Sequence, residues 1–328
     1  MPAGVVPGVL AAVVRVLVTG AAGYVGSVVA IRLAAAGHEA VPWDLAGGRD
    51  VRDPVPLARA LHGAGAVVHC AARTLVAESY ADPGAYWVHN LGGTVTLLNA
   101  MRTARVRTVV FSSTAAVYGD PETVPVTEDH PARPVTPYGA SKLACDTLLA
   151  EYARLYGFAA VSLRYFNVAG AHRHGRTWAG ERHDPETHLI PNVLAAARDG
   201  TPALVCGVGW PTPDGTCIRD YVHVTDLADA HLLALGAARP GEHLTCNLGS
   251  GTGFSVREVL AMCRRVTGQR IEEKTASRRP GDPAVLVASP ARAAAALGWV
   301  PRRGLHQMVA SAWAHTLQEA SRKARDDG

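Results

Sequence analysis

The chain has 328 residues, which is long enough for one large domain or two modest ones with a substantial core. Its formal net charge of +4 is small, and the sequence has neither a basic block nor arginines interleaved with aromatic residues, so we expect no nucleic-acid partner. No stretch of about 18 uncharged apolar residues occurs, so we expect no membrane-spanning segment.

The cysteines and the amino terminus indicate a cytoplasmic protein. The six cysteines form no CxxC motif and no closely spaced framework, which is typical of reduced thiols in a cytoplasm. The first thirteen residues are apolar, but no positively charged segment precedes them and they run directly into a predicted strand. We expect them to form a loose extension rather than a signal peptide.

A short apolar strand followed at once by a glycine-rich turn begins the folded part of the chain. Residues 14–19 predict the strand and residues 25–36 predict a helix, with Gly20, Gly23 and Gly26 between or at the start of them. In a dinucleotide-binding turn, the first glycine permits the tight turn and the second lets backbone N–H groups approach a pyrophosphate. The third lets the helix pack closely on the strand.

A second strand, residues 39–43, ends at Asp44. This is about the position at which an acidic residue meets the adenosine ribose of a bound dinucleotide. The strand, turn, helix, strand and acid together predict a dinucleotide site, with NAD as the expected cofactor. Arg49 leaves open a cofactor with a 2′-phosphate.

Strand and helix patterns continue to alternate through the first half of the chain. Residues 66–72, 106–112 and 159–165 predict further buried strands, and residues 86–105 predict a helical stretch. This alternation predicts an α/β fold with a doubly wound parallel (Rossmann-type) sheet, whose ligands gather at the carboxyl ends of the strands.

The character of the sequence changes after about residue 170. Loops rich in Pro, Gly and His cover residues 172–191 and 207–217, which indicates a second, smaller α+β substrate domain. The segment from about Gln318 reads as a polar tail. The dinucleotide-binding domain is expected to span 14–168, rejoined by about 220–250, and the substrate domain to span 169–219 and 251–320.

Tyr138 and Lys142 form a pair with catalytic character. Lysine is rare in this chain, and Lys142 stands four residues after Tyr138 in a predicted helix, so both side chains share a helix face. At roughly 5 Å and an effective dielectric of about 20, the ammonium charge favours the phenolate by about 3 kcal/mol. Lowering the tyrosine pKa by about three units needs about 4 kcal/mol, so a second cation such as an oxidised nicotinamide ring is required. The YxxxK spacing alone also fits an ordinary surface helix.

Several stretches along nearly the whole chain resemble one family. They are VTGAAGYVG, VVHCAA, HNLGGT, FSSTAAVYG, YGASK, LRYFNVAGAH, TPDGTCIRDYVHV, CNLGSG and SRRPGD. These stretches are similar to the extended short-chain dehydrogenases/reductases, and segments 164–172 and 212–224 resemble their UDP-galactose (UDP-glucose) 4-epimerases in particular. The resemblance implies a tightly held NAD, a UDP-sugar substrate and a homodimer formed through the helices around 85–105 and 140–156.

The same resemblance implies roles for individual residues. Thr114 and Tyr138 would address the sugar O4, and Lys142 would grip the nicotinamide ribose. Arg219 and Arg279 would hold the diphosphate, to which the planar forks of two arginines are suited. The implied cofactor site comprises Gly20, Gly23, Tyr24, Val25, Gly26, Asp44, Asp50, Val51, Ala71, Ala72, Asn90, Ser112, Tyr138, Lys142 and Tyr165. The implied substrate site comprises Thr114, Tyr138, Asn167, His188, Leu189, Cys206, Arg219, Arg279, Asp282 and Leu286.

Three positions depart from the family's pattern. The segment between Asp44 and Asp50 is much shorter than usual, so one strand or loop beside the adenosine must be abbreviated. His188 stands where many relatives have asparagine, and Thr74 stands where lysine is common. These departures leave the catalytic residues in place but affect the expected contacts.

The implied reaction inverts C4 of a UDP-hexose. Tyr138, assisted by Thr114, would take the proton of the 4-hydroxyl while the C4 hydride passes to NAD. The 4-keto sugar would then turn over, and hydride and proton would return to its other face. Leu286 stands where a tyrosine restricts some relatives to glucose and galactose, so the N-acetyl sugars are expected as substrates too, unless Leu286 is simply an apolar strand residue that faces the core.

Other reactions of this fold need other residues. Nucleotide-sugar 4,6-dehydratases carry an Asp–Glu pair, and UDP-glucuronate decarboxylases commonly a glutamate, in the stretch where Ala115 and Ala116 stand here. A 4-ketoreductase that releases its cofactor remains open. So does a non-catalytic NAD-binding sensor, although a sensor has no need of an activated phenol.

The spacing of the histidines predicts no metal site. His172, His174, His183 and His188 show no ligand spacing typical of zinc, so we expect them to be solvated or to line the substrate site. His69, at the end of a predicted strand, is expected to be a packed core histidine.

Overall fold

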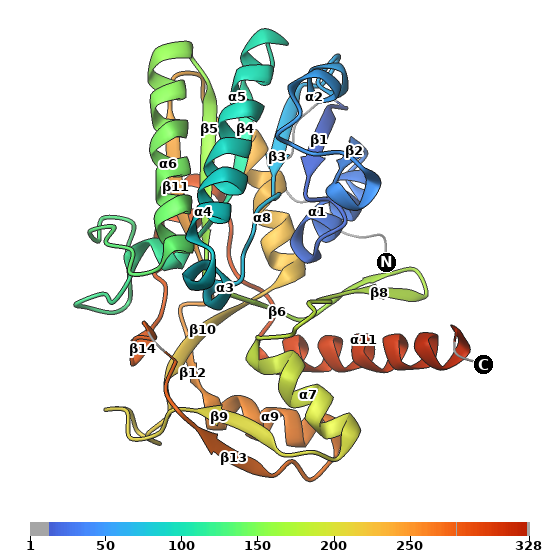
Figure 1. Cartoon of the computed structure of the whole chain (residues 1–328), viewed down its shortest axis with the longest axis vertical. Coiled ribbons are helices and arrows are strands. Elements are labelled where there is room, and N and C mark those ends of the chain that lie inside the picture. The colour runs from blue at the N-terminus through green and yellow to red at the C-terminus, as the bar shows by residue number, and fades with distance from the viewer. Residues whose placement is uncertain (1–12, 280, 327–328) are drawn as a thin grey trace.

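The computed structural model describes residues 13–279 and 281–326. The predicted amino-terminal extension therefore lies almost entirely outside the described residues. Figure 1 shows a larger unit built around a parallel sheet and, below it, a smaller unit of helices and short strands.

Six parallel strands form the main sheet, in the order β11-β5-β4-β3-β1-β2. The chain moves outward from β1 to β2 and then crosses to β3 on the other side of β1. The direction of winding therefore reverses between β1 and β3, which is where a doubly wound sheet binds its ligand. The strands are β1 (Arg15–Thr19), β2 (Glu39–Trp43), β3 (Ala66–His69), β4 (Thr108–Thr114), β5 (Ala159–Tyr165) and β11 (His243–Leu248).

Helices cover both faces of this sheet because successive strand residues point to opposite sides. Val16 and Val18 pack in one core cluster with α1 (Tyr24–Ala35) and α8 (Val224–Ala237). Leu17 lies in a second cluster, with α5 (Gly93–Thr103), α6 (Pro137–Tyr156) and α2 (Pro54–Ala60). The structure thus has the predicted Rossmann-type architecture, in which strands buried on both faces read as unbroken apolar runs.

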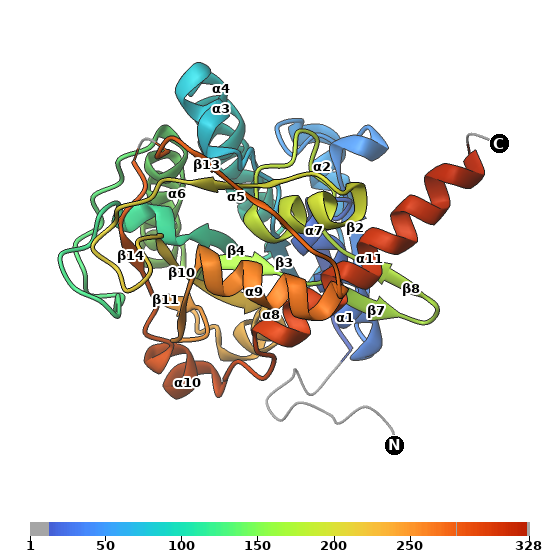
Figure 2. The ribbon, with the colours of Figure 1, turned by 90° about the horizontal axis from the view of Figure 1, so that it is seen from below.

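The smaller unit has its own core, formed chiefly by three helices that contact one another. They are α7 (Leu189–Asp199), α9 (Val256–Thr267) and α11 (Leu305–Asp326). The last turns of α11 project beyond the body of the protein, beside the hairpin β7–β8 (Figures 1 and 2). The hairpin strands are β7 (His172–His174) and β8 (Thr177–Ala179), and the parallel pair beside α7 and α9 is β9 (Ala203–Cys206) and β13 (Glu273–Ala276).

Strand β10 (Ile218–His223) connects the two units through the strands that pair with it. Its first half pairs with β12 (Gly253–Ser255) and β14 (Val285–Leu286), and its second half pairs with β6 (Asn167–Ala169). The remaining elements are α3 (Val76–Ala81), α4 (Pro83–Tyr86), α10 (Ala291–Leu297), the π-helical turn η2 (Trp87–Gly92) and the 3-10 turns η1 (Leu45–Gly47) and η3 (Ala115–Tyr118).

Most predicted elements are confirmed within two residues, but strand β3 ends at His69 rather than at 72, and two further predictions need correction. Strand β4 begins at Thr108 rather than at 106, because Arg105 adopts a positive φ and Val106 N–H bonds back to Met101. The predicted polar tail is wrong: helix α11 continues through Gln318, whose side chain bonds the backbone of Trp178 at both N–H and C=O. None of the described helices is long and apolar enough to cross a membrane.

Candidate functional site

The glycine turn after β1 is packed too tightly for any side chain. Gly20 has φ +71°, and a Cβ atom there would lie 2.7 Å from the backbone nitrogen of Ala71. A Cβ on Gly26 would lie 2.1 Å from the carbonyl oxygen of Gly20. Gly23 donates its N–H to the same oxygen at 3.1 Å and precedes the first turn of α1. The turn therefore brings bare backbone and a helix amino terminus to one place, which suits a pyrophosphate.

A cavity of about 180 Å³ opens beside this turn, at the carboxyl ends of β1, β2 and β3. Six of the predicted cofactor residues line it: Gly20, Asp44, Asp50, Val51, Ala71 and Ala72. Arg73 and His89 also line it and were not predicted, although Arg73 directly follows a predicted contact and could have been included on that ground.

Carboxylates at the cavity are held by nearby donors. The Asp44 carboxylate accepts the N–H of Ala22 in the glycine turn at 3.0 Å and the N–H of Ala46 at 3.0 Å. Asp50 pairs with Arg52, and the hydrogen bond from Arg52 holds the pKa of Asp50 below its usual range. Asp44 thus stands at the rim of the cavity, as an acid that receives ribose hydroxyls must.

The residues present fit a dinucleotide. The short segment after Asp44 forms the single turn η1, and β2 is the edge strand on this side. The shortening expected beside the adenosine therefore falls at the edge of the sheet, and the glycine turn and the cavity are still formed. Arg49 lines the cavity but donates to the carbonyl of Pro42 at 2.8 Å, so its guanidinium is already engaged.

Tyr138, Lys142 and Thr114 come together where β4 ends and α6 begins. Thr136 caps α6 by accepting the N–H of Gly139 at 2.9 Å, and this cap places Tyr138 in the first turn. Thr114 is the last residue of β4, and its hydroxyl makes a hydrogen bond with Tyr138. Lys142 is buried, with its ammonium 4.3 Å from the centre of the Phe111 ring. Thr114 and Tyr138 thus lie together, and Lys142 follows Tyr138 one turn farther along α6, with its ammonium over the Phe111 ring.

The pKa of Tyr138 is not lowered in the protein alone. Burial of the hydroxyl raises the pKa of Tyr138 to about 12, against the hydrogen bond from Thr114, which lowers it, and Lys142 is not among the groups that shift it. The lowering of the Tyr138 pKa that was expected from Lys142 is therefore not found in the protein without ligands. Bringing the pKa from about 12 to about 7 needs about 7 kcal/mol, and two cations at roughly 5 Å supply about 6–7 kcal/mol at an effective dielectric of about 20. Two such cations near the hydroxyl would therefore be needed for Tyr138 to act as a base near pH 7, and Lys142 and the nicotinamide ring of a bound NAD are the groups that could supply them.

Other predicted cofactor residues lie between the cavity and this cluster. The Tyr165 hydroxyl donates to Ser112 Oγ at 2.7 Å, and Ser112 Oγ donates to Cys70 Sγ. Asn90 is fully engaged: its side chain bonds the backbone of Arg73 at both N–H and C=O and donates to Ser141 Oγ. It therefore acts on the cofactor site by tying loop 71–74 to helix α6.

The two arginines predicted to hold the diphosphate lie on different segments: Arg219 is on strand β10, and Arg279 is in the loop between β13 and β14. The Nη2 atom of Arg219 on β10 forms an ion pair with Oδ1 of Asp282 at 3.2 Å, but it makes no well-aligned hydrogen bond with any residue in the described ranges 13–279 and 281–326. Arg279 donates to the carbonyl of Thr187 at 3.1 Å, beside the amino terminus of α7 and its predicted contacts His188 and Leu189. A buried, incompletely bonded guanidinium is an energetic cost that an anionic ligand can relieve.

Leu286 lies between the arginines and the catalytic cluster. It pairs with Arg219 in the β10–β14 register and packs against a cluster that includes Ala115, the residue after Thr114. Asn167 begins β6, which joins the same strand β10. Cys206 is less directly placed: it ends β9, on the far side of the small unit's core.

The histidines divide into three groups. His69 is buried between Thr19 and Thr94 and burial lowers its pKa to about 3, which confirms a packed core histidine. His172 bonds Thr225, away from the other members of the predicted set. His183 and His188 meet each other and two glutamates that the sequence analysis did not single out, Glu181 and Glu186. The pattern E-x-H-x-x-E-x-H would have been the signal.

Comparison with known proteins places the chain in one family. The model of the NAD dependent epimerase/dehydratase family matches residues 16–249. A curated protein of Streptomyces lividans named UDP-glucose 4-epimerase is 52% identical over 318 residues, which cover 91% of this chain and 95% of that protein.

Solved structures agree as well. UDP-glucose 4-epimerase from Brucella ovis in complex with NAD has a TM-score of 0.85 and 42% identity, covering 92% of this chain and 98% of its own. The enzyme of that name from Bifidobacterium longum, in complex with NAD+ and UDP, has a TM-score of 0.87 and 33% identity, covering 93% and 99%. The chain belongs to the NAD-dependent epimerase/dehydratase family.

Proposed function

We propose that the protein inverts C4 of a UDP-hexose, interconverting UDP-glucose and UDP-galactose. The observation that carries the proposal is the cluster of Thr114, Tyr138 and Lys142 between the dinucleotide cavity and the two arginines of β10 and its neighbouring loop. Relatives that are UDP-glucose 4-epimerases by name, over nearly the whole chain, support it.

Each residue of the cluster has a task in this reaction. Tyr138 takes the proton from the sugar 4-hydroxyl and returns it after the sugar has turned over, while the Thr114 hydroxyl donates to the phenolate and stabilises it. Lys142 supplies a buried positive charge beside the phenol. Bound NAD would accept the C4 hydride and give it back, so the reaction has no net redox change. The glycine turn, Asp44 and the other predicted cofactor contacts would hold that NAD.

The two residues that follow Thr114 limit the chemistry. Ala115 and Ala116 follow it in the turn η3, where they offer no proton donor or acceptor on their side chains. Removal of water or of a carboxylate from the sugar would need such a group. Inversion at C4 needs only the phenol, and this favours the epimerase.

The proposal is tested by incubating the purified protein with UDP-glucose or UDP-galactose without added nucleotide and resolving the products. We expect both substrates to reach the same mixture of the two sugars. Conversion that requires stoichiometric NADH or NADPH would instead identify a ketoreductase, and NAD binding without conversion would identify a sensor.

We expect Arg219→Ala and Arg279→Ala to weaken the binding of UDP. Each substitution removes a charge-assisted partner from the diphosphate, at a cost of about 2–5 kcal/mol. Isothermal titration with UDP alone measures the effect, and Arg265→Ala, an exposed arginine on α9, is the matched control. Unchanged UDP affinity in both variants would place the nucleotide elsewhere.

We expect the pocket to accept UDP-N-acetylglucosamine because Leu286 lacks the ring and hydroxyl of tyrosine. Leu286→Tyr should reduce kcat/KM for the N-acetyl sugar relative to UDP-glucose by about tenfold or more, the usual result of filling a pocket. Leu286→Ala, which leaves the space open, is the control. If wild type turns over no N-acetyl sugar, or if tyrosine leaves the ratio unchanged, Leu286 is a packing residue.

We further infer a homodimer and a cytoplasmic location. Exposed apolar side chains gather on the two segments that the family resemblance implicates, at Trp87, Val88, Val95, Leu155 and Tyr156. Helices α5 and α6, which carry much of this surface, run side by side (Figure 1). Sedimentation equilibrium tests the dimer, and a monomer at micromolar concentration would contradict it.

The six free cysteines support a reducing compartment, which subcellular fractionation would test.

A further inference from the structure

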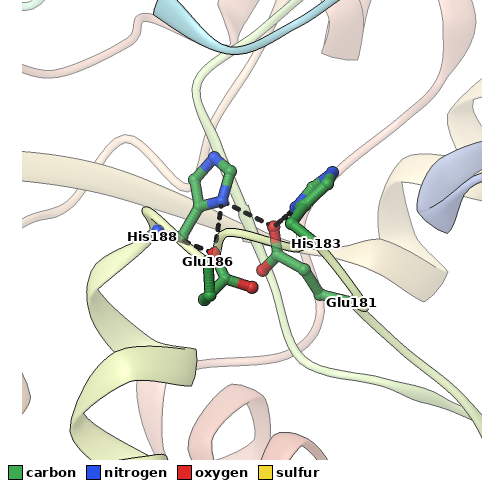
Figure 3. Close-up of side chains that lie close together, drawn as sticks. All are labelled: Glu181, His183, Glu186 and His188. Carbon is green, nitrogen blue, oxygen red and sulfur yellow. Dashed lines mark hydrogen bonds and ion pairs between the residues drawn. The ribbon is translucent and has the colours of Figure 1, made fainter. Parts of the chain in front are cut away.

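The loop between β8 and α7 gathers two imidazoles and two carboxylates around one point. Glu181, His183, Glu186 and His188 each offer one ligand atom, and these four atoms lie within 4.8 Å of one another. Figure 3 shows the side chains converging from a single stretch of loop. Only His188 of this group belongs to the predicted substrate site, and none of the four side chains has a role in the proposed proton or hydride transfer.

The contacts within the group are close and share atoms. Oε1 of Glu181 lies 2.9 Å from Nδ1 of His183 and 2.7 Å from Nδ1 of His188. Oε1 of Glu186 lies 3.0 Å from the same nitrogen of His188. One imidazole nitrogen therefore faces two carboxylate oxygens, although it can place a single proton between them. A cation at the centre would satisfy both carboxylates and both imidazoles at once.

We propose that Glu181, His183, Glu186 and His188 bind one divalent transition-metal ion of the Zn²⁺ and Co²⁺ class. Two carboxylates and two neutral imidazoles carry two negative charges, which a divalent ion balances. Tetrahedral coordination with bonds of about 2.0–2.1 Å separates neighbouring ligand atoms by about 3.3 Å, so the paired atoms, now 2.7–3.0 Å apart within a group that spans at most 4.8 Å, would need only small shifts to surround an ion. Two nitrogen ligands favour this class over Mg²⁺ and Ca²⁺, which prefer oxygen alone.

The burial of the group is that of a structural site. The side chain of Glu181 is 7% exposed and that of His188 is 44% exposed, so the ion would lie half-covered at the edge of the protein. Glu186 is also fixed by the backbone N–H groups of Thr187 and His188. The second ring nitrogen of His188 points away from the glutamates (Figure 3), so metal binding through Nδ1 would leave it uncoordinated.

The ion would fix a loop that touches both ligand sites. Glu181 lines a small cavity together with Gly170, whose carbonyl accepts the hydroxyl of Tyr24 from the cofactor turn. At the other end of the loop, the carbonyl of Thr187 accepts Arg279. A loop held by the metal ion would therefore fix the positions of these two contacts relative to each other.

The test uses the full-length protein, purified without a histidine tag, freed of metal with a chelator and titrated with Co²⁺ alone and Zn²⁺ alone. We expect one ion per chain, d–d absorption of the Co²⁺ form and a higher Tm with either ion. His183→Ala and Glu181→Gln should weaken binding at least about tenfold, because loss of even a supporting contact costs 10–100-fold. His174→Ala, an exposed histidine on β7 outside the group, should bind as wild type does.

Two outcomes would overturn the proposal. One is wild-type protein that shows no d–d absorption with Co²⁺ and no rise in Tm with either ion. This outcome can be observed without any variant. The other is a folded His183→Ala protein, judged by circular dichroism, that binds as wild type does. Because the titration uses neither UDP-sugar nor turnover, its failure is separate from any failure of the proposed epimerase activity.

Discussion

Tyr138→Phe is expected to lower kcat for UDP-glucose by about 10²–10⁴-fold, the usual consequence of losing a general acid/base. The substitution removes one oxygen and keeps the ring, which packs edge to face on Tyr86 at 6.2 Å between centroids. UDP binding, measured by titration, should therefore remain close to that of wild type.

Tyr156→Phe is the matched control for Tyr138→Phe. It alters a tyrosine at the other end of the same helix, far along α6 from Thr114. Its kcat should equal that of wild type. Near-normal turnover by Tyr138→Phe would remove the phenol from the mechanism and with it the proposed role of Thr114.

Gly26→Ala is expected to abolish NAD retention and to destabilise the fold by about 1–3 kcal/mol, as overpacking does. The new methyl group would lie 2.1 Å from the carbonyl oxygen of Gly20, and because that oxygen belongs to the backbone it cannot rotate away as a flexible side chain would. The turn must open, and the N–H groups aimed at the pyrophosphate must move. NAD released on denaturation and Tm measure the two effects.

Gly304→Ala controls for the chemistry of a glycine-to-alanine change. A Cβ there meets nothing within 4 Å, and its φ lies outside the left-handed region. We expect unchanged NAD content and a change in Tm of a degree or two at most, typical of a surface site. A Gly26→Ala protein with a full complement of NAD would show that the turn does not bind the pyrophosphate.

The first half of the fold could be predicted from sequence because each element carries a local signal. Strands β2 and β5 have the predicted bounds, β5 because it is an apolar run buried on both faces and β2 because it is a short apolar run that ends at Asp44. The carboxyl-terminal helix could not be predicted to its end. Its polar residues from Gln318 onward gain their helical context from the hairpin β7–β8, which is distant in sequence.

The residues of the candidate site could be proposed from the sequence, whereas their electrostatics could not. The i, i+4 spacing predicts that Tyr138 and Lys142 share one face of a helix, α6 spans both positions, and the resemblance adds Thr114. The pKa of Tyr138 could not be predicted, because it depends on the burial that the whole surrounding structure produces. The group of Glu181, His183, Glu186 and His188 was missed because an irregular loop has no periodicity from which a shared face can be read.

The central claim is that one carbon, C4, loses and regains the same hydride while its proton passes through Tyr138. It is tested most directly with UDP-glucose that carries deuterium at C4, converted by the purified protein without added nucleotide. The account predicts UDP-galactose that retains the deuterium at C4, and no deuterium entering C4 when unlabelled substrate is converted in D₂O. UDP-galactose that has lost the label to solvent, or no UDP-galactose at all, would contradict it.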